Sequence, residues 1–227
     1  MMRNYTEEEK IGFLKNTETG VFTDAMRLIK AGKWMDNILP IRPDMRLAGR
    51  AFTVTFSEVK DSGQKYYKNF EMIDHIQPGD IVVIGKEGLE NYNVHSMMGE
   101  NMVHAMINKQ AAGLVFDGRT RDYGVIAGMS LPAFCNGGPT AIIDNMNLQY
   151  TKLNIPVVCG GVEVKPGDYI VGDTDGILVI SPEDIDKILY QAERIALLEK
   201  ICEFALDNNI PMTDMLELSH LKKIPRQ

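Results

Sequence analysis

The sequence has few cysteines, and they are widely spaced. The three are Cys135, Cys159 and Cys202, and no CxxC pair occurs. A disulfide framework uses an even set of cysteines and a thiolate zinc site uses closely spaced ones, so the sequence suggests neither. Isolated thiols of this kind are typical of buried, reduced cysteines in a reducing compartment.

Positive charge and long apolar runs are also scarce. The chain has 24 Lys and Arg against 31 Asp and Glu, which gives a formal net charge of −7. A nucleic-acid-binding protein needs a basic face, and Lys222 with Lys223 is too small a cluster to supply one. No apolar run approaches the roughly 20 residues that span a bilayer, and Glu7, Glu8 and Glu9 stand where a secretory signal would be apolar. We therefore expect a cytoplasmic protein with no nucleic-acid or membrane partner.

Two further features are missing: a low-complexity linker and a glycine-rich nucleotide loop after an early strand. The first absence favours a single domain over residues 1–227, because this length suffices for one large domain with its own core. The second argues against a methyltransferase. Hydrophobic and charged contents of 44% and 24% are ordinary for a globular protein.

Between residues 50 and 180, short strands outnumber helices. Runs of β-forming residues bounded by turn residues predict strands at 51–56, 81–84, 114–116, 132–135, 155–159, 169–171 and 177–180. A Pro-Gly-Asp turn precedes two of them, at 78–80 and 166–168, and Asp173 and Asp175 fit a further turn better than a metal site. This order departs from regular βαβ alternation, so we expect an α/β layered sandwich with a mixed sheet.

Helix signals lie mainly towards the two ends of the chain. Thr6 followed by Glu9 is a capping-box pattern, and Ser181 followed by Pro182 is a strong helix start. Helices are predicted over about 6–16, 25–31, 65–76, 181–206 and 213–221. The sheet should therefore carry helical N- and C-terminal extensions.

The stretch from Met98 to Asp122 combines the features that suit a small anionic ligand. A loop at Gly99 opens a helix, and an apolar strand over 114–116 then ends in a turn followed by Arg121 and Asp122. A helix start attracts anions, an Arg side chain binds a carboxylate with two hydrogen bonds, and an Asp side chain is a hard oxygen ligand for a divalent cation. Together they suit a small 2-oxo acid chelated to Mg²⁺.

Several motifs occur in a fixed order along the chain. They are Leu39-Pro40-Ile41-Arg42-Pro43, Leu47-Ala48-Gly49-Arg50-Ala51, Pro78-Gly79-Asp80, Gly99-Glu100, Asp117-Gly118-x-x-Arg121-Asp122, Gly160-Gly161-Val162, Pro166-Gly167-Asp168 and Asp173-x-Asp175-Gly176. In order and spacing they resemble the family that contains the regulator of ribonuclease E activity A and the class II 4-hydroxy-4-methyl-2-oxoglutarate aldolases. The resemblance covers roughly residues 19–206, which leaves 207–227 as a C-terminal extension.

The resemblance implies a swivelling β/β/α fold, assembled as homotrimers or homohexamers with the pocket between subunits. In the aldolase branch, Mg²⁺, Mn²⁺ or another divalent cation holds a pyruvate-like enolate. By position in the motif, Asp122 would bind the metal and Arg121 would hold the substrate carboxylate. Gly99, Asn101 and Met102 match the loop whose main-chain N–H groups contact the substrate.

Two further acidic positions follow from the same resemblance. Glu100 stands where those aldolases often have Asp, and it would orient water at the metal. The aldolases also draw a glutamate from the C-terminal region of a neighbouring subunit, for which the candidates are Glu193, Glu199 and Glu203, with Glu199 the first choice.

The reaction implied is metal-dependent cleavage of a 4-hydroxy-2-oxo acid through a pyruvate enolate, with decarboxylation of oxaloacetate as a side activity. Two alternatives remain at this point. One is a non-catalytic regulator like the ribonuclease inhibitor, because a protein can keep a fold and its pocket without the activity of its relatives. The other is a related lyase or hydratase acting on a sugar acid.

Structural explanations exist for the same residues. Arg121 with Asp122 would, outside this motif, be a local ion pair, and Glu100 is also placed to face the positive end of a helix. Arg119 is an additional cation that the motif does not require, and a solvated or interface ion pair explains it better than a second substrate contact.

Overall fold

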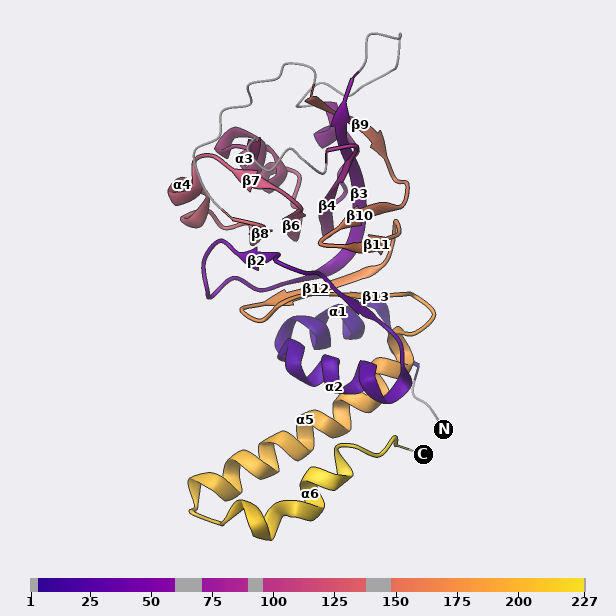
Figure 1. Ribbon diagram of the computed structural model, residues 1–227, viewed down its shortest axis with the longest axis vertical. Coiled ribbons are helices and arrows are strands. Elements are labelled where there is room, and N and C mark those ends of the chain that lie inside the picture. Colours follow the sequence, from indigo (N-terminus) through magenta and orange to yellow (C-terminus); the bar gives the residue numbers. More distant parts are fainter. Residues whose placement is uncertain (1–3, 60–70, 90–95, 138–147, 227) are drawn as a thin grey trace. The chain divides into compact units, whose positions relative to one another are not determined.

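The computed structural model describes residues 4–59, 71–89, 96–137 and 148–226. The chain divides into two compact units, most of whose helices and strands are labelled in Figure 1. The sheet unit comprises residues 33–179, and the helical unit comprises residues 1–32 together with 180–227. A single domain over residues 1–227 stays a prediction.

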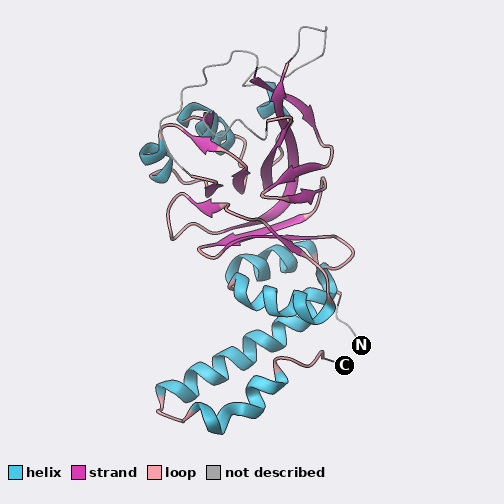
Figure 2. Cartoon of the chain, in the orientation of Figure 1, coloured by secondary structure: helices cyan, strands magenta, loops and turns pink. Residues whose placement is uncertain are grey.

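A nine-stranded mixed sheet forms the body of the sheet unit (Figure 2). Its strands are β1 (Lys33–Trp34), β2 (Leu39–Pro40), β3 (Leu47–Glu58), β4 (Asp80–Glu87), β6 (Gly113–Phe116), β8 (Ala133–Cys135), β9 (Leu148–Leu153), β12 (Tyr169–Asp173) and β13 (Gly176–Ile180). They follow the order β1-β13-β12-β3-β4-β6-β8-β2, and β9 pairs with β3 outside this path. The pairs β3–β4, β4–β6 and β6–β8 are parallel, whereas β12, β9 and β2 join antiparallel. The predicted α/β class with a mixed sheet is confirmed.

The long strand β3 organises this sheet. Its residues 51–57 are all buried, as expected for a run of β-branched and aromatic residues in a sheet that is covered on both faces. Strand β4 pairs with it in parallel, while β12 and β9 pair with its beginning and its end. A register shift between Thr55 and Phe56 interrupts the β9 pairing. Such an irregularity bends a strand and increases its twist, which gives the sheet its curl.

Smaller elements of the sheet unit connect these strands. They are the 3-10 helix η1 (Glu71–His75), strand β5 (Ser96–Met98), helix α3 (Glu100–Asn108), strand β7 (Arg119–Thr120), helix α4 (Tyr123–Ala127) and strands β10 (Val157–Cys159) and β11 (Val162–Val164). Helices α3 and α4 contact each other, and Val103, Met106 and Ile126 from them belong to the core that also contains β4 and β6. The predicted helix start at Gly99 is confirmed.

Helix α4, strand β9 and the short strands β1, β2, β5, β7 and β11 were not predicted from the sequence. One expected helix is only partly described. Helix α4 has five residues, one of them Gly124, so no helical period is visible in it. Strand β9 is stabilised by its pairing with β3, which is a tertiary contact. The first half of the helix expected over 65–76 lies outside the described residues, and the described half contains the 3-10 helix Glu71–His75.

The two Pro-Gly-Asp turns share one geometry. The Asp80 carboxylate accepts a hydrogen bond from the Gln77 N–H at 2.8 Å, and the Asp168 carboxylate accepts one from the Lys165 N–H at 2.8 Å. The N–H of each aspartate also donates to the carbonyl oxygen of the residue three positions earlier. The glycine lies in the left-handed region, with φ of 89° at Gly79. Burial raises the pKa of both aspartates, and the predicted turns are confirmed.

The helical unit consists of helices α1 (Glu7–Asn16), α2 (Thr19–Ile29), α5 (Ile185–Asp207) and α6 (Leu216–Leu221) with the 3-10 helix η2 (Met212–Met215). Both α1 and α2 contact α5. The capping box at the start of α1 is confirmed, since the Thr6 hydroxyl accepts the Glu9 N–H at 3.2 Å and the Glu9 carboxylate accepts the Thr6 N–H at 2.9 Å. Within the described residues, no helix combines the length and apolar character needed to cross a membrane.

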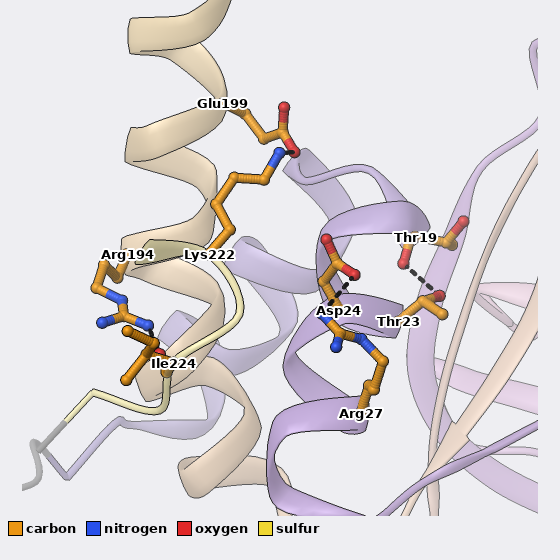
Figure 3. Close-up of polar contacts among 8 residues, drawn as sticks. All are labelled: Thr19, Thr23, Asp24, Arg27, Arg194, Glu199, Lys222 and Ile224. Carbon is orange, nitrogen blue, oxygen red and sulfur yellow. Dashed lines mark hydrogen bonds and ion pairs between the residues drawn. The ribbon is translucent and has the colours of Figure 1, made fainter. Parts of the chain in front are cut away.

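Three helix starts were predicted in the wrong place. Helix α2 begins at Thr19 and not at Ala25, because the Thr23 hydroxyl donates back to the Thr19 carbonyl oxygen at 3.0 Å inside the helix (Figure 3). Helix α5 begins at Ile185, since the Ser181 hydroxyl bonds to the Asp184 carboxylate at 3.0 Å instead of capping a backbone N–H. The last helix begins only after η2.

We expect Gly79→Ala to lower the free energy of unfolding by about 1 kcal/mol, because Ala is strained at a positive φ. A Cβ at this position would meet no atom within 4 Å, so the loss would report the backbone conformation alone. The matched control is Gly124→Ala, where a Cβ likewise meets nothing within 4 Å but the residue is helical. That variant should be as stable as the wild type or more so by about 0.5–1 kcal/mol. Urea unfolding measures both, and equal effects would contradict the assigned turn.

Candidate functional site

The candidate site is assembled where two short parallel strands end. Strand β5 pairs in parallel with β7, with Ser96 opposite Arg119 and Met98 opposite Thr120. Parallel strands finish at the same edge, so the residues that follow each strand emerge side by side. Gly99 and helix α3 follow β5, while Arg121 and Asp122 follow β7. Segments more than 20 positions apart in sequence thereby meet.

The carboxylate of Asp122 connects these two segments directly. Its Oδ2 accepts a hydrogen bond from the Glu100 N–H at 3.2 Å and lies 3.5 Å from Nε of Arg121. Asp122 is in the left-handed conformation, with φ 56° and ψ 28°, and it precedes helix α4 without capping it by its side chain. The structure therefore brings Glu100, Arg121 and Asp122 together. The ion pair between Arg121 and Asp122 is also the structural role that the sequence suggested for these two residues. Glu100 likewise lies in the first turn of a helix, as its structural explanation requires.

Gly99 leaves the space between the charged groups open. A Cβ on Gly99 would lie 3.0 Å from Nε of Arg121 and 3.1 Å from Oδ2 of Asp122. The residue has an ordinary extended φ of −144°, so glycine is required here for room and not for backbone freedom. The side chains remain accessible, with exposed fractions of 55% for Arg121 and 34% for Asp122.

The start of helix α3 offers unequal donors. The Met102 N–H already donates to the Gly99 carbonyl oxygen at 3.1 Å, and its side chain is buried in the core. For the Asn101 N–H, the described part of the chain provides no acceptor. The first N–H groups of a helix carry partial positive charge and need partners from outside the helix. Asn101 is therefore the better placed of the two main-chain donors.

The C-terminal glutamates belong to the helical unit. Glu199 forms an ion pair with Lys222, shown in Figure 3, and Glu193 lies 3.6 Å from Arg226. Glu203 is exposed, and no described residue forms an ion pair with it. A cavity of about 410 Å³ in this unit is lined by Glu193, Tyr5 and residues of α1. None of the residues predicted for the site in the sheet unit lines it.

Other polar residues of the sheet unit have structural roles. Asp117 forms an ion pair with Lys86 at 3.3 Å, and its carboxylate accepts a hydrogen bond from Asn136 at 3.3 Å. The Asp175 N–H donates to the Asp173 carboxylate at 3.0 Å, so this Asp-x-Asp-Gly sequence forms a turn as predicted. Arg119 is half-buried. Its guanidinium has no hydrogen bond or ion pair with a described residue, so the predicted solvated or interface ion pair of Arg119 stays a prediction.

The side chains present fit a hard cation better than a soft one. The described residues contain no cluster of three or more His, Cys, Asp or Glu side chains. Burial raises the pKa of the Cys135 thiol to about 11 and also raises that of Cys159, which disfavours the thiolate forms that bind zinc. Mg²⁺ usually keeps several waters and takes only one or two carboxylates from a protein. Asp122, with its Oδ1 unengaged among the described residues, satisfies that requirement.

Two hydroxyl groups behind this site were not predicted from the sequence. Ser96 and Thr120 are fully buried, and their hydroxyls hydrogen-bond to the backbone of the two segments that meet here. The available signal was the small polar residue between Arg119 and Arg121. In a strand, its side chain points to the face opposite the two arginines.

Comparisons with known proteins agree on a family. The model of the RraA-like family, described as Aldolase/RraA, matches residues 19–179. A relative in Halalkalibacterium halodurans, named "Putative 4-hydroxy-4-methyl-2-oxoglutarate aldolase", is 32% identical over 133 residues, which are 59% of this chain and 61% of that protein. Against two further curated relatives, the chain spans 31% and 52% of their lengths.

Solved structures show the same fold. A protein from Pseudomonas syringae pv. tomato superposes with a TM-score of 0.78 and 21% identity, over 93% of this chain and 98% of that one. Streptomyces coelicolor RraAS2, described as an unusual member of the RNase ES inhibitor RraA protein family, gives a TM-score of 0.73 and 21% identity, over 89% and 98%. At these identities the likeness concerns the fold alone.

The left-handed conformation of Asp122 leads to a stability prediction. We expect Asp122→Asn to be more stable than Asp122→Ala by about 1 kcal/mol, because Asn tolerates this conformation and Ala does not. An Asn side-chain oxygen also keeps an acceptor for the Glu100 N–H. Urea unfolding of both variants measures the difference. Equal stabilities would show that Asp122 does not depend on this backbone conformation or on that hydrogen bond.

Proposed function

The chain belongs to the RraA-like family, and on that premise we propose that it is a divalent-metal-dependent lyase acting on a small 2-oxo acid. The observation that carries the proposal is the shared Asp122 carboxylate, which lies next to both the start of α3 and the Arg121 guanidinium. A carboxylate for a cation, a helix start for an anion and a guanidinium for a substrate carboxylate would thus be available in one accessible place. The aldolase name of the Halalkalibacterium halodurans relative supports the choice of reaction.

Arg121 is the residue proposed to bind the substrate carboxylate. Its Nε faces Asp122, which leaves the two terminal nitrogens of the guanidinium to form a bidentate pair with a carboxylate. The Asn101 N–H at the helix start would donate to an oxygen of the same substrate. These contacts would hold the 2-oxo acid in one orientation, with its keto oxygen towards Asp122.

Asp122 is the residue proposed to hold Mg²⁺ or a similar divalent cation, through the oxygen that does not accept the Glu100 N–H. When bound, the cation supplies Lewis-acid stabilisation of the negative charge that develops on the keto oxygen. The substrate's own keto and carboxylate oxygens and water would complete the ligand set.

Glu100 is proposed to orient the water that accepts the proton of the C4 hydroxyl. As that proton leaves, the C4 oxygen forms a carbonyl with C4, the C3–C4 bond breaks and its electron pair moves into the enolate of pyruvate. The enolate then takes a proton from water at C3. The Asn101 N–H, which needs no reorganisation to donate, stabilises the developing charge. Oxaloacetate would lose CO₂ through the same enolate.

We further propose that the protein assembles as a homotrimer or homohexamer and that a C-terminal glutamate completes the site of a neighbouring subunit. Glu199 remains the first candidate. Its ion pair with Lys222 would have to open for this role, whereas Glu203 is exposed and needs no such change.

Pyruvate release should require Mg²⁺ and both charged residues. With 4-hydroxy-2-oxo acids or oxaloacetate, a coupled lactate dehydrogenase assay should show turnover that EDTA abolishes. Asp122→Asn should lower kcat by ~10²–10³ because it removes one well-placed charged group, and Arg121→Lys should mainly raise KM because it loses the bidentate contact. Asp24→Asn is the matched control, since it removes an exposed Asp–Arg pair with the same 3.5 Å separation in the helical unit (Figure 3).

Turnover that survives both EDTA and Asp122→Asn would refute the metal-dependent mechanism. No turnover on any 2-oxo acid, with a stoichiometric protein partner recovered instead, would favour the non-catalytic regulator. Turnover of sugar acids alone would favour the related lyase or hydratase.

The shared site predicts complementation between inactive subunits. Arg121→Gln and Glu199→Gln subunits, each inactive alone, should regain activity when co-expressed, because some sites in the mixed oligomer would then hold both native residues. Light scattering measures the assembly, and Glu203→Gln and Glu193→Gln serve as parallel partners. Absence of recovery with all three would contradict a glutamate donated between subunits. Recovery with only one would identify it.

A further inference from the structure

Ser96 occupies an unusual position behind the candidate site. It is the first residue of β5, and its side chain is fully buried. Its hydroxyl donates to the carbonyl oxygen of Met98 at 2.6 Å and accepts the backbone N–H of Arg121 at 2.8 Å. One hydroxyl therefore joins the residue that precedes Gly99 to the backbone of Arg121.

Regular pairing between β5 and β7 provides few hydrogen bonds to hold these two segments together. Strand β7 has only two residues, and the register shifts between Ser96 and Met98. The direct bond from the Arg121 N–H to the Met98 carbonyl oxygen is long, at 3.2 Å. The bond to the Ser96 hydroxyl is therefore the shorter of the two hydrogen bonds that hold the Arg121 N–H.

The Thr120 hydroxyl, like that of Ser96, lies beside the Met98 carbonyl oxygen, but it gives the Arg121 N–H no acceptor. This buried hydroxyl lies 3.0 Å from the Met98 carbonyl oxygen and 2.8 Å from the carbonyl oxygen of Arg121. If the Ser96 hydroxyl were removed, Met98 would keep a donor. The Arg121 N–H would keep only its longer bond. Loss of Ser96 should consequently loosen Arg121 and Asp122 while the start of α3 stays in place.

We infer that Ser96 is a positioning residue, whose hydroxyl holds Arg121 and Asp122 in register with the amide groups at the start of α3. The inference rests on the proposed function. Ser96 touches neither substrate nor cation in this arrangement, and it acts through the backbone of Arg121. Misplacement of a binding group by about 1 Å can cost ~10²-fold in rate, so the effect should exceed that of losing an ordinary buried hydroxyl.

The test compares Ser96→Ala with Ser57→Ala in the full-length protein. Ser57 is also a buried strand serine of the sheet unit, and its hydroxyl lies 2.7 Å from that of Thr151. Both variants should lose similar stability in urea. Ser96→Ala should lower kcat by ~10–10²-fold with a smaller change in KM, and Ser57→Ala should leave both near the wild-type values. Ser96→Cys, which keeps the size and a weak acceptor, should fall between Ser96→Ala and the wild type and serves if the alanine variant does not fold.

Amide hydrogen exchange gives a second measurement that does not require turnover. The Arg121 N–H should exchange faster in Ser96→Ala than in Ser57→Ala, while the amides of helix α3 exchange alike in both. Equal exchange at Arg121, or equal kinetic losses in the two variants, would overturn the positioning role. An inactive wild type would refute the proposed lyase, and the exchange comparison would still decide whether Ser96 holds Arg121.

Discussion

The parallel pairing of β5 with β7 is the constraint on which the candidate site depends. It places the start of helix α3 and the Arg121–Asp122 pair at one edge, where a single carboxylate oxygen can accept the Glu100 N–H and face the guanidinium. The pairing is short, so buried hydroxyls on both strands supplement it. The helix dipole, the guanidinium and the carboxylate act together only because this edge holds them within hydrogen-bonding range.

The charges of Arg121, Asp122 and the start of α3 determine which ligands this edge of the β5–β7 pair can bind. Within the chain, Asp122 is partly neutralised by Arg121 and by the helix start. One of its oxygens nevertheless stays unengaged among the described residues. The missing side chain at Gly99 keeps the space beside both groups free. A small chelating anion and a hard cation would enter such a place as a pair, each offsetting the charge that the other brings.

Much of the architecture could be predicted from the sequence. The apolar runs at 81–84, 114–116 and 177–180 became strands because each is too short and too apolar for a surface helix. The two Pro-Gly-Asp turns formed as predicted, because proline and glycine fix the backbone locally and the aspartate bonds three residues back. The errors at Thr23 and Ser181 arose where a hydroxyl had two competing partners. The local sequence does not determine which of the two partners the hydroxyl binds.

The sequence by itself determined the family, the strand-rich α/β class and the identity of the residues that carry charge at the site, since these depend on residue type and order. The tertiary structure decided which of those residues meet. The 3.2 Å contact between Glu100 and Asp122 joins positions 22 residues apart. The buried hydroxyl of Ser96 likewise has a role at the site only because the fold places the Arg121 N–H beside it. Such contacts follow from strand pairing across the chain, which no local pattern encodes.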